Sequence, residues 1–356
     1  MHTPVCDLLG IEVPIVQAPM AGGWTTPALV AGVSEAGGLG TLAGGRVPAE
    51  DLRRLIQDTR RLTHRPFGVN LLDPPPAAPG PDDAAAPAVL RSIRERLGIP
   101  AEPPPGSSDV PSAAEALDIT LDLGVRIVSF AMGSPRPFVD RAHAAGAIVI
   151  GTATTVAEAE EVEAAGADVV VTQGSEAGGH RSTYAIGRLD EVPLVGTMAL
   201  VPAVVDAVRL PVLAAGGIMD GRGIVAALAL GAQGVQLGTR FLLATESAAP
   251  PSYRRQLMSA DETGTLVTDV YSGRPARGLR NAFARLFQAS GARPLPYPRQ
   301  GAAAADIYRA SLQGDAEFAT LFAGQGLRLA RREQPAGAIV RELVEEVRGV
   351  RARLRE

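Results

Sequence analysis

The sequence predicts an α/β fold, a TIM (β/α)8 barrel with a smaller C-terminal helical subdomain. Eight short apolar runs alternate with segments of helical length over about 240 residues, and eight is the number of strands that closes such a barrel. The runs are apolar throughout, which is typical of parallel strands covered on both faces. Aromatic residues make up only 4% of a chain that is 46% hydrophobic, so small aliphatic side chains must form the core.

The predicted strands are 14–20, 39–44, 66–72, 126–132, 147–153, 168–174, 211–218 and 234–242. Segments with helical patterns lie between them, among them 26–38, 49–62, 135–146, 156–166 and 220–231. Several of these helices end in Ala-Gly directly before the next strand. Glycine there stops a helix and allows the turn into the strand.

Two regions interrupt the alternation. Residues 73–112 are rich in proline, alanine and glycine, and we expect a surface excursion that holds one helix, at 88–98, between flexible flanks. The second region follows Leu242, where helical patterns cover 252–260, 278–287, 303–314 and 315–326. The predicted domains are therefore a cofactor-binding barrel at 1–242, a helical subdomain covering the active site at 243–325, and a C-terminal helix at 326–356 that packs back on the barrel.

Composition excludes several classes of protein. A net charge of −4 provides neither a basic patch for nucleic acid nor a polybasic membrane anchor. The single cysteine, Cys6, excludes an intrachain disulfide and a metal cluster built from cysteines, and we expect no metal ion. No stretch approaches the ~20 apolar residues of a membrane span, and the first ten residues do not resemble a signal peptide. We expect a cytoplasmic protein.

The loops after the seventh and eighth predicted strands indicate a phosphate site. They contain Gly216 and Gly217 in one loop and Gly238 and Thr239 in the other. In TIM barrels these two loops often hold phosphate, because glycine lets backbone N–H groups approach its oxygens. The helix that opens at 220 would add its N-terminal dipole. Glycines that merely permit tight turns are the alternative, but their presence in both loops favours phosphate.

Polar side chains at other strand ends suit a heterocyclic ring. Residues 17–20, Asn70 and Gln173 end three predicted strands, and amides can pair with the donors and acceptors of an isoalloxazine or a purine. Each amide could instead bind loop backbone. His180 follows Gln173 in the glycine-containing loop GSEAGGHR, 174–181, and imidazole there suits a general base or a hydrogen-bond donor. The other histidines have ordinary surface positions.

The sequence resembles the nitronate monooxygenase family, formerly the 2-nitropropane dioxygenases. The stretches that carry the resemblance are PIVQAPMAGG, VSEAGGLGTLAGG, RPFGVNLL, VVVTQGSEAGGH, PVLAAGGIMDGRGIVAALALGAQGVQLGTRFL and YSGRPARGLRN. The resemblance implies a TIM barrel with non-covalent FMN that oxidises alkyl nitronates with dioxygen to a carbonyl compound and nitrite. The positions that it implies for FMN contact are Asn70, Gln173, Gly178, Gly217 and 236–239 (Gln236, Leu237, Gly238 and Thr239), with Met20 and Ala21 beside the flavin ring.

By the same resemblance, His180 either deprotonates a neutral nitroalkane or orients an anionic nitronate, and Ser272 is a further polar group of the site. The chain departs from the family after the histidine. Arg181 is followed by Ser182, Thr183 and Tyr184, where the family often has glycine, and a bulkier loop would change the space for substrate.

Three other interpretations stay open. Flavin-dependent enoyl-acyl carrier protein reductases share the fold and a nearly identical EAGGH loop, and they use NAD(P)H. The second alternative is a flavin-binding protein without turnover, but such a protein would be free to lose His180. The third is a barrel that binds another phosphorylated ligand, and that protein would be colourless. An apolar helical face also makes a homodimer plausible.

Overall fold

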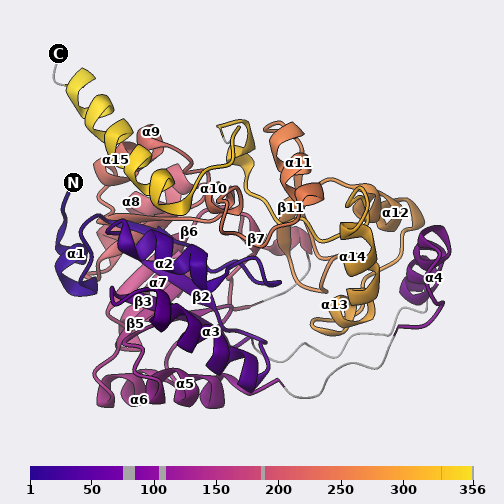
Figure 1. Cartoon of the computed structure of the whole chain (residues 1–356), viewed down its shortest axis with the longest axis horizontal. Helices are drawn as coiled ribbons and strands as arrows, with labels where there is room; N and C mark the ends of the chain where they lie inside the picture. Colours follow the sequence, from indigo (N-terminus) through magenta and orange to yellow (C-terminus); the bar gives the residue numbers. More distant parts are fainter. Residues whose placement is uncertain (75–84, 104–109, 186–188, 330, 355–356) are drawn as a thin grey trace.

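All eight predicted strands are present and form one parallel sheet that closes into a TIM barrel (Figure 1). The structure is a computed structural model that describes residues 1–74, 85–103, 110–185, 189–329 and 331–354. The barrel strands are β1 (Ile15–Gln17), β2 (Gly40–Ala43), β3 (Phe67–Leu72), β4 (Ile127–Ala131), β5 (Ile148–Ala153), β6 (Val169–Gln173), β8 (Val212–Ala215) and β9 (Gly234–Leu237).

The barrel closes where β1 meets β2, and a side chain helps to close it. Val16 and Leu39 form an isolated parallel bridge, and Leu39 N donates to Ile15 O at 2.9 Å. Beyond this bridge the Oε1 of Gln17 accepts a hydrogen bond of 3.0 Å from Thr41 N, in place of a backbone carbonyl. Gln17 is fully buried. Its amide therefore serves barrel closure rather than a ligand.

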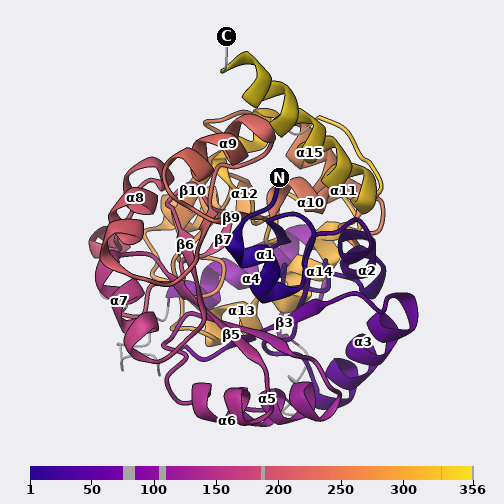
Figure 2. The ribbon, with the colours of Figure 1, turned by 90° about the vertical axis from the view of Figure 1, so that its left-hand side faces the viewer.

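Helices surround the strands as a ring, which Figure 2 shows. They are α2 (Pro27–Glu35), α3 (Ala49–Leu62), α5 (Ala113–Asp122), α6 (Val139–Ala144), α7 (Val156–Ala164), α8 (Thr197–Ala207) and α9 (Gly221–Ala229), with a 3₁₀ turn η1 (Leu189–Glu191). Their buried faces are mostly Leu, Val, Ile and Ala, as the composition predicts. Such small aliphatic faces let helix and strand backbones approach closely.

A short N-terminal helix, α1 (Pro4–Leu9), covers the amino-terminal end of the barrel. Val5, Cys6 and Leu9 are buried against barrel residues such as Val169 and Leu213. The end of the barrel opposite the strands' carboxyl ends is therefore filled with apolar side chains. Cys6 is part of this core.

The C-terminal part lies over the carboxyl ends of the barrel strands (Figure 1). Its helical elements are α10 (Thr239–Leu242), α11 (Pro251–Ser259), α12 (Ala282–Ser290), α13 (Arg299–Ala303), α14 (Ala305–Leu312) and the 3₁₀ turn η2 (Gln325–Leu329). It also contains two strands, β10 (Thr265–Thr268) and β11 (Ala276–Leu279), which pair antiparallel. β11 pairs in turn with β7 (Gly179–His180), a two-residue strand in the loop after β6.

The purely helical character predicted for 243–325 is therefore wrong in two places. Gly278 and Leu279 lie in β11, and the helix α12 begins only after Asn281, whose side chain accepts a hydrogen bond from Ala284 N. Residues 315–324, predicted as helical, contain no helix, and Phe322 forms an isolated bridge with Gly278. Pairing with distant strands overrides the local helical pattern in both cases.

The excursion after β3 contributes a helix to the C-terminal part. Helix α4 (Ala85–Leu97) packs against α12 and α14 through Leu90 and Ile93. Nε of Arg94 donates to the Asp306 carboxylate at 2.8 Å, and the arginine is buried. The flanks predicted as flexible, 75–84 and 104–109, lie outside the described residues.

The last helix, α15 (Ala336–Arg353), returns to the barrel and packs on α2 and α9. Ile339, Leu343 and Val347 are buried beside Ile224 and Ala227 of α9. Figure 1 shows this helix running back from the C-terminal part along the outside of the barrel.

Replacing Gly40 with alanine tests the close packing of α2 on β2. An added Cβ would lie 2.2 Å from the backbone oxygen of Val30, so the helix must move away from the strand. We expect the Gly40→Ala variant to lose about 2–3 kcal/mol of unfolding free energy. Gly349, exposed in α15 with only the Arg353 side chain nearby, is the matched control. Gly349→Ala should gain about 0.5–1 kcal/mol. Equal denaturation midpoints for the two variants would contradict this packing.

Candidate active site

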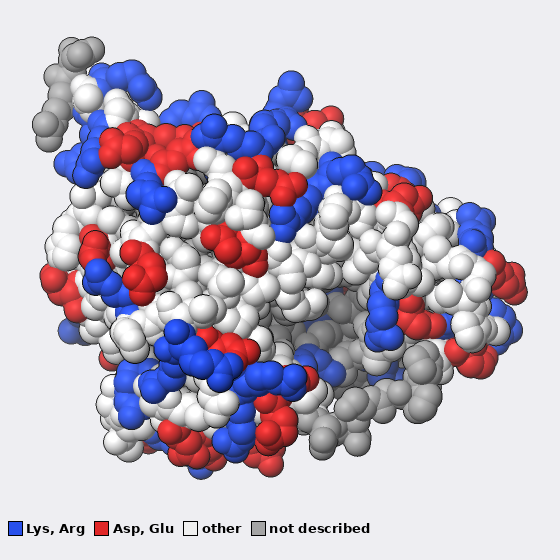
Figure 3. Space-filling model, viewed as in Figure 1, with Lys and Arg blue, Asp and Glu red and all other residues white. Residues whose placement is uncertain are grey.

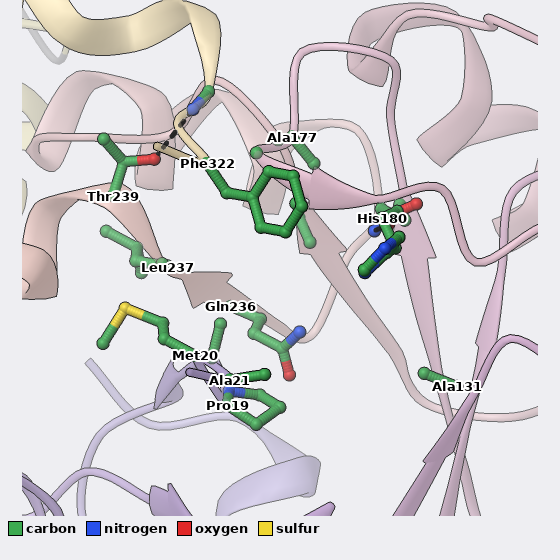
Figure 4. A pocket seen from close by; sticks show the side chains of 18 of the residues that line it. Pro19, Met20, Ala21, Ala131, Ala177, His180, Gln236, Leu237, Thr239 and Phe322 are labelled. Atoms are coloured by element: carbon green, nitrogen blue, oxygen red, sulfur yellow. Dashed lines mark hydrogen bonds between the residues drawn. The ribbon is translucent and has the colours of Figure 1, made fainter. Parts of the chain in front are cut away.

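A deep pocket opens at the carboxyl ends of the barrel strands, between the barrel and the C-terminal part. Figure 3 shows the hollow in the surface at this junction. All the residues predicted to hold a cofactor line it: Met20, Ala21, Asn70, Gln173, Gly178, Gly216, Gly217, Gln236, Leu237, Gly238 and Thr239. His180 also lines it, and Figure 4 shows this side chain across the cavity from Gln236 and Met20.

The glycine-rich end of the pocket is built from the loops after β8 and β9. Gly216 has a φ of 119°, which L side chains rarely adopt, and a Cβ there would meet the Thr197 hydroxyl at 2.8 Å. A Cβ at Gly238, by contrast, would touch only Ala18, at 3.5 Å. Gly238 therefore borders open space, which suits the close approach of a ligand to its backbone.

The N-terminus of α9 is already occupied, which corrects one expectation. Asp220 caps the helix by accepting hydrogen bonds from Arg222 N and Gly223 N, and Gly221 N donates to Glu346 at 2.8 Å. Because carboxylates bind these N–H groups, the end of this helix does not supply free donors to a phosphate.

One wall of the pocket, the segment 322–326 of the C-terminal part, is not predicted by the sequence pattern. Gly324 N donates to the hydroxyl oxygen of Thr239 at 2.9 Å, so the hydroxyl hydrogen of Thr239 stays free to donate to a ligand. Gln325 N donates to Glu176 O at 2.9 Å, and Tyr253 OH donates to Phe322 O. The two glycines of FAGQG are the sequence signal for this close approach, although the local pattern predicts a helix.

Gln173 holds the loop that carries His180. Its Nε2 donates to His180 O at 2.9 Å, and its Oε1 accepts from Ser182 N at 3.0 Å. The guanidinium of Arg181, fully buried, donates to the carbonyls of Gln173 and Gly174. The loop is thus folded on itself by side chains at both of its ends, and the pairing of β7 with β11 fixes its tip.

The His180 ring lies in a largely apolar and aromatic environment. Its Nε2 is 2.8 Å from the Ser272 hydroxyl, and the rings of Phe322 and Tyr297 lie edge-on at centroid distances of 5.0 and 5.8 Å. Burial, and next the positive charge of Arg274, lower the pKa of His180 from 6.5 to about 4. The imidazole is therefore neutral at neutral pH. Ser272 itself does not line the pocket and lies behind His180.

The residues after His180 do not narrow the pocket as the sequence suggested. Thr183 Oγ1 and Tyr184 N both bind the Glu158 carboxylate, at 2.7 and 2.8 Å, and neither residue lines the cavity. Of this run only Ser182 lines it. The glutamate of α7 turns the bulk of the loop away from the substrate space.

The floor of the pocket contains further residues that the sequence does not predict. Asn70 Nδ2 donates to Ser129 Oγ at 2.9 Å, which joins β3 to β4 beneath the cavity. Met132, at the end of β4, has a φ of 70°, unusual for a residue with a side chain. Trp24 lines the other side and packs edge-on against Tyr253.

The described ranges contain no group of three or more side chains that could hold a metal ion. Within the same ranges, no helix is long and apolar enough to cross a membrane.

A TIM barrel with glycine-rich loops after its last two strands and a histidine beside a concave pocket defines a class, the barrel enzymes that bind a phosphorylated cofactor. Residues 2–346 match the sequence model of the nitronate monooxygenase family, and the chain belongs to that family. It is thus a flavin-dependent oxidoreductase.

Known relatives cover nearly the whole chain. A nitronate monooxygenase of Pseudomonas aeruginosa is 45% identical, over 96% of this chain and 98% of its own length. The structure of a nitroalkane oxidase from Streptomyces ansochromogenes superposes with a TM-score of 0.91 at 41% identity, covering 98% of this chain and 99% of that one. FabK from Thermotoga maritima superposes with a TM-score of 0.78 at 34% identity, covering 100% and 99%.

Proposed function

We propose that the protein oxidises alkyl nitronates, or nitroalkanes, with dioxygen to a carbonyl compound and nitrite, and that FMN is its cofactor. The observation that carries the proposal is the neutral His180 beside a pocket whose opposite end is rich in glycine, in a chain of this family. A small nitronate needs one oriented polar group and an otherwise apolar site, and the pocket offers both.

The residues present fit FMN. Gly216, Gly217, Gly238 and Thr239 would hold the phosphate, because Gly238 borders open space and the Thr239 hydroxyl is free to donate. Met20 and Ala21 would offer an apolar surface for the ring, and the Asn70 amide in the same pocket would contact it. When bound, the flavin supplies the redox chemistry, accepting electrons from the substrate and passing them to dioxygen.

We infer that His180 orients an anionic nitronate rather than deprotonating a neutral nitroalkane. A base with a pKa of about 4 has little affinity for a proton taken from carbon, and the ideal catalytic base has a pKa near the working pH. A neutral imidazole can still hydrogen-bond to a nitronate oxygen. Ser272, bonded to Nε2, would set the rotation of the ring.

A homodimer also remains our proposal. The exposed apolar side chains Leu194, Val195 and Met198, at the start of α8, form a surface that a second copy could cover.

Replacing His180 tests its role. We expect His180→Ala to lower kcat/KM for alkyl nitronates roughly 10- to 100-fold, the value of one hydrogen bond to a charged group. His180→Asn, which keeps an N–H donor, should lose less. Steady-state rates with ethyl nitronate and with nitroethane measure both effects. An Asn variant that loses only the nitroethane reaction would show that His180 is a base.

Replacing Gly238 with valine tests the phosphate position. Since only Ala18 lies near an added side chain, the fold should be kept while the phosphate space is filled. The purified variant should contain less than about a tenth of the wild-type flavin, with an unchanged circular dichroism spectrum. Undiminished flavin content would place the phosphate elsewhere.

The visible spectrum of the purified protein tests the whole proposal. Under anaerobic conditions, addition of ethyl nitronate should change the flavin absorbance, and air should restore it while nitrite accumulates. HPLC of the released cofactor should identify FMN. A flavin that ignores nitronate but is bleached by NADH or NADPH would instead support the enoyl-thioester reductase, and a colourless protein would exclude both activities.

A further inference from the structure

Arg274 is a buried cation without a carboxylate partner in the described part of the chain. Only 1% of its surface is exposed. Its guanidinium donates to backbone carbonyls, those of Thr183, Met132 at 3.4 Å and Arg181 at 3.5 Å. Hydrogen bonds to carbonyls satisfy the donors of a guanidinium but leave its charge in place, and a charge kept from water acts strongly on its neighbours.

This charge lies beside His180. One bond from the Arg274 guanidinium reaches the carbonyl of Arg181, the residue that follows His180. From the other direction, the backbone N of Arg274 donates to Ser272 Oγ at 3.3 Å, and the same oxygen is 2.8 Å from the imidazole Nε2. Arg274 is thus bonded through its backbone to Ser272, which contacts the imidazole, and through its side chain to the residue after His180.

The other groups that face His180 do not cancel the charge. Tyr297 and Phe322 present rings, and burial keeps the pKa of Tyr297 raised, so it is neutral. Arg46 lies over the Tyr297 ring, 5.8 Å from its centroid, and adds a second cation. The negative charge of Glu158 in α7 acts on Arg274, but no ion pair joins the two, and the Glu158 carboxylate is bound to Thr154, Thr183 and Tyr184.

The backbone carbonyl of Met132 accepts a hydrogen bond from Arg274. Met132 has a left-handed φ of 70°, is 1% exposed, and offers its carbonyl to the Arg274 guanidinium. Non-glycine residues rarely adopt this conformation, and such outliers gather at functional sites. Arg274 thereby ties β4, which ends at the pocket, to the strand that carries His180.

We propose that Arg274 is a positioning residue that acts through His180. It does not line the pocket, and its buried positive charge behind the imidazole favours the binding of a small planar anion beside His180. The proposal rests on the proposed function, because a nitronate is such an anion. Burial lowers the pKa of Arg274 to about 10, so its guanidinium stays charged at neutral pH and below. Binding of the anion is therefore favoured by a charge that does not titrate in this range, and His180 is left to orient it.

Arg277 provides a matched control. It is a second buried arginine, in β11, but its guanidinium donates to Ser175 O at 2.7 Å and Thr265 Oγ1 at 3.0 Å. The charge that lowers the pKa of His180 is that of Arg274. Replacing either arginine with methionine removes one buried charge and leaves carbonyl or hydroxyl groups unpaired. Only Arg274→Met should change the histidine.

The first experiment follows the imidazole by NMR of the holoenzyme labelled with ¹⁵N-histidine, with His180→Asn to assign the signal. Loss of the cation should raise the pKa of His180 by roughly one unit or more in Arg274→Met, while burial keeps it below 6.5. Arg274→Lys should stay near the wild type because the charge is kept, and Arg277→Met should stay there too. A histidine pKa equal in wild type and Arg274→Met would overturn the proposal.

The second experiment uses nitrate, a planar anion, as a probe, and its pH series uses wild-type holoenzyme alone. Nitrate binding, followed by the flavin absorbance, should have an equal dissociation constant from pH 5.5 to 8, and Arg274→Met should weaken it about tenfold or more. Binding that weakens tenfold per pH unit would mean that a protonated histidine holds the anion, which overturns the proposal. Neither measurement needs turnover, so an enzyme inactive with nitronates would refute the proposed function alone.

Discussion

The site depends on one short backbone pairing, Gly179 and His180 against Arg277 and Ala276. The first two residues belong to a loop of the barrel, and the other two belong to the C-terminal part. Without this pairing Gly179 and His180 would lose their backbone partners in β11, and the histidine would depend on side-chain contacts alone for its direction. The same pairing brings the segment 322–326 over the glycine-rich end, because β11 bridges to Phe322.

Three buried guanidinium groups reinforce this junction. The chain contains no lysine, so apart from its four histidines every basic side chain is an arginine. Arg181, Arg274 and Arg277 each donate to several backbone carbonyls or hydroxyls of the loop and its neighbours. A planar group with five donors can join separate segments in this way, which a single ammonium group does less well. The loop is therefore joined to its neighbours through buried guanidinium groups.

The barrel and most of the pocket lining could be predicted from the sequence. The regular spacing of the apolar runs predicts parallel strands. In a barrel the carboxyl ends of all the strands lie on the same side. Met20, Asn70, Gln173, Gly217 and Gly238 therefore meet in one cavity, whatever else surrounds them. His180 could be placed beside them because it lies only a short loop beyond the end of β6.

Other parts could not be predicted, because their roles come from distant partners. Gln173 resembles a ligand-binding amide in the sequence, yet in the fold both ends of its amide hold the His180 loop. Thr183 and Tyr184 look bulky in sequence, yet Glu158 turns them away. Residues 315–324 have a helical pattern but lie extended against β11.

The sequence by itself determined the barrel, the glycine-rich loops and the position of the histidine along the chain, since these depend on local periodicity and on the order of strands. Only the tertiary structure decided which charges surround the histidine. Arg274 is far from His180 in the chain, and its effect depends on burial and on the absence of a nearby carboxylate partner among the described residues. These are properties of packing, to which no local pattern corresponds.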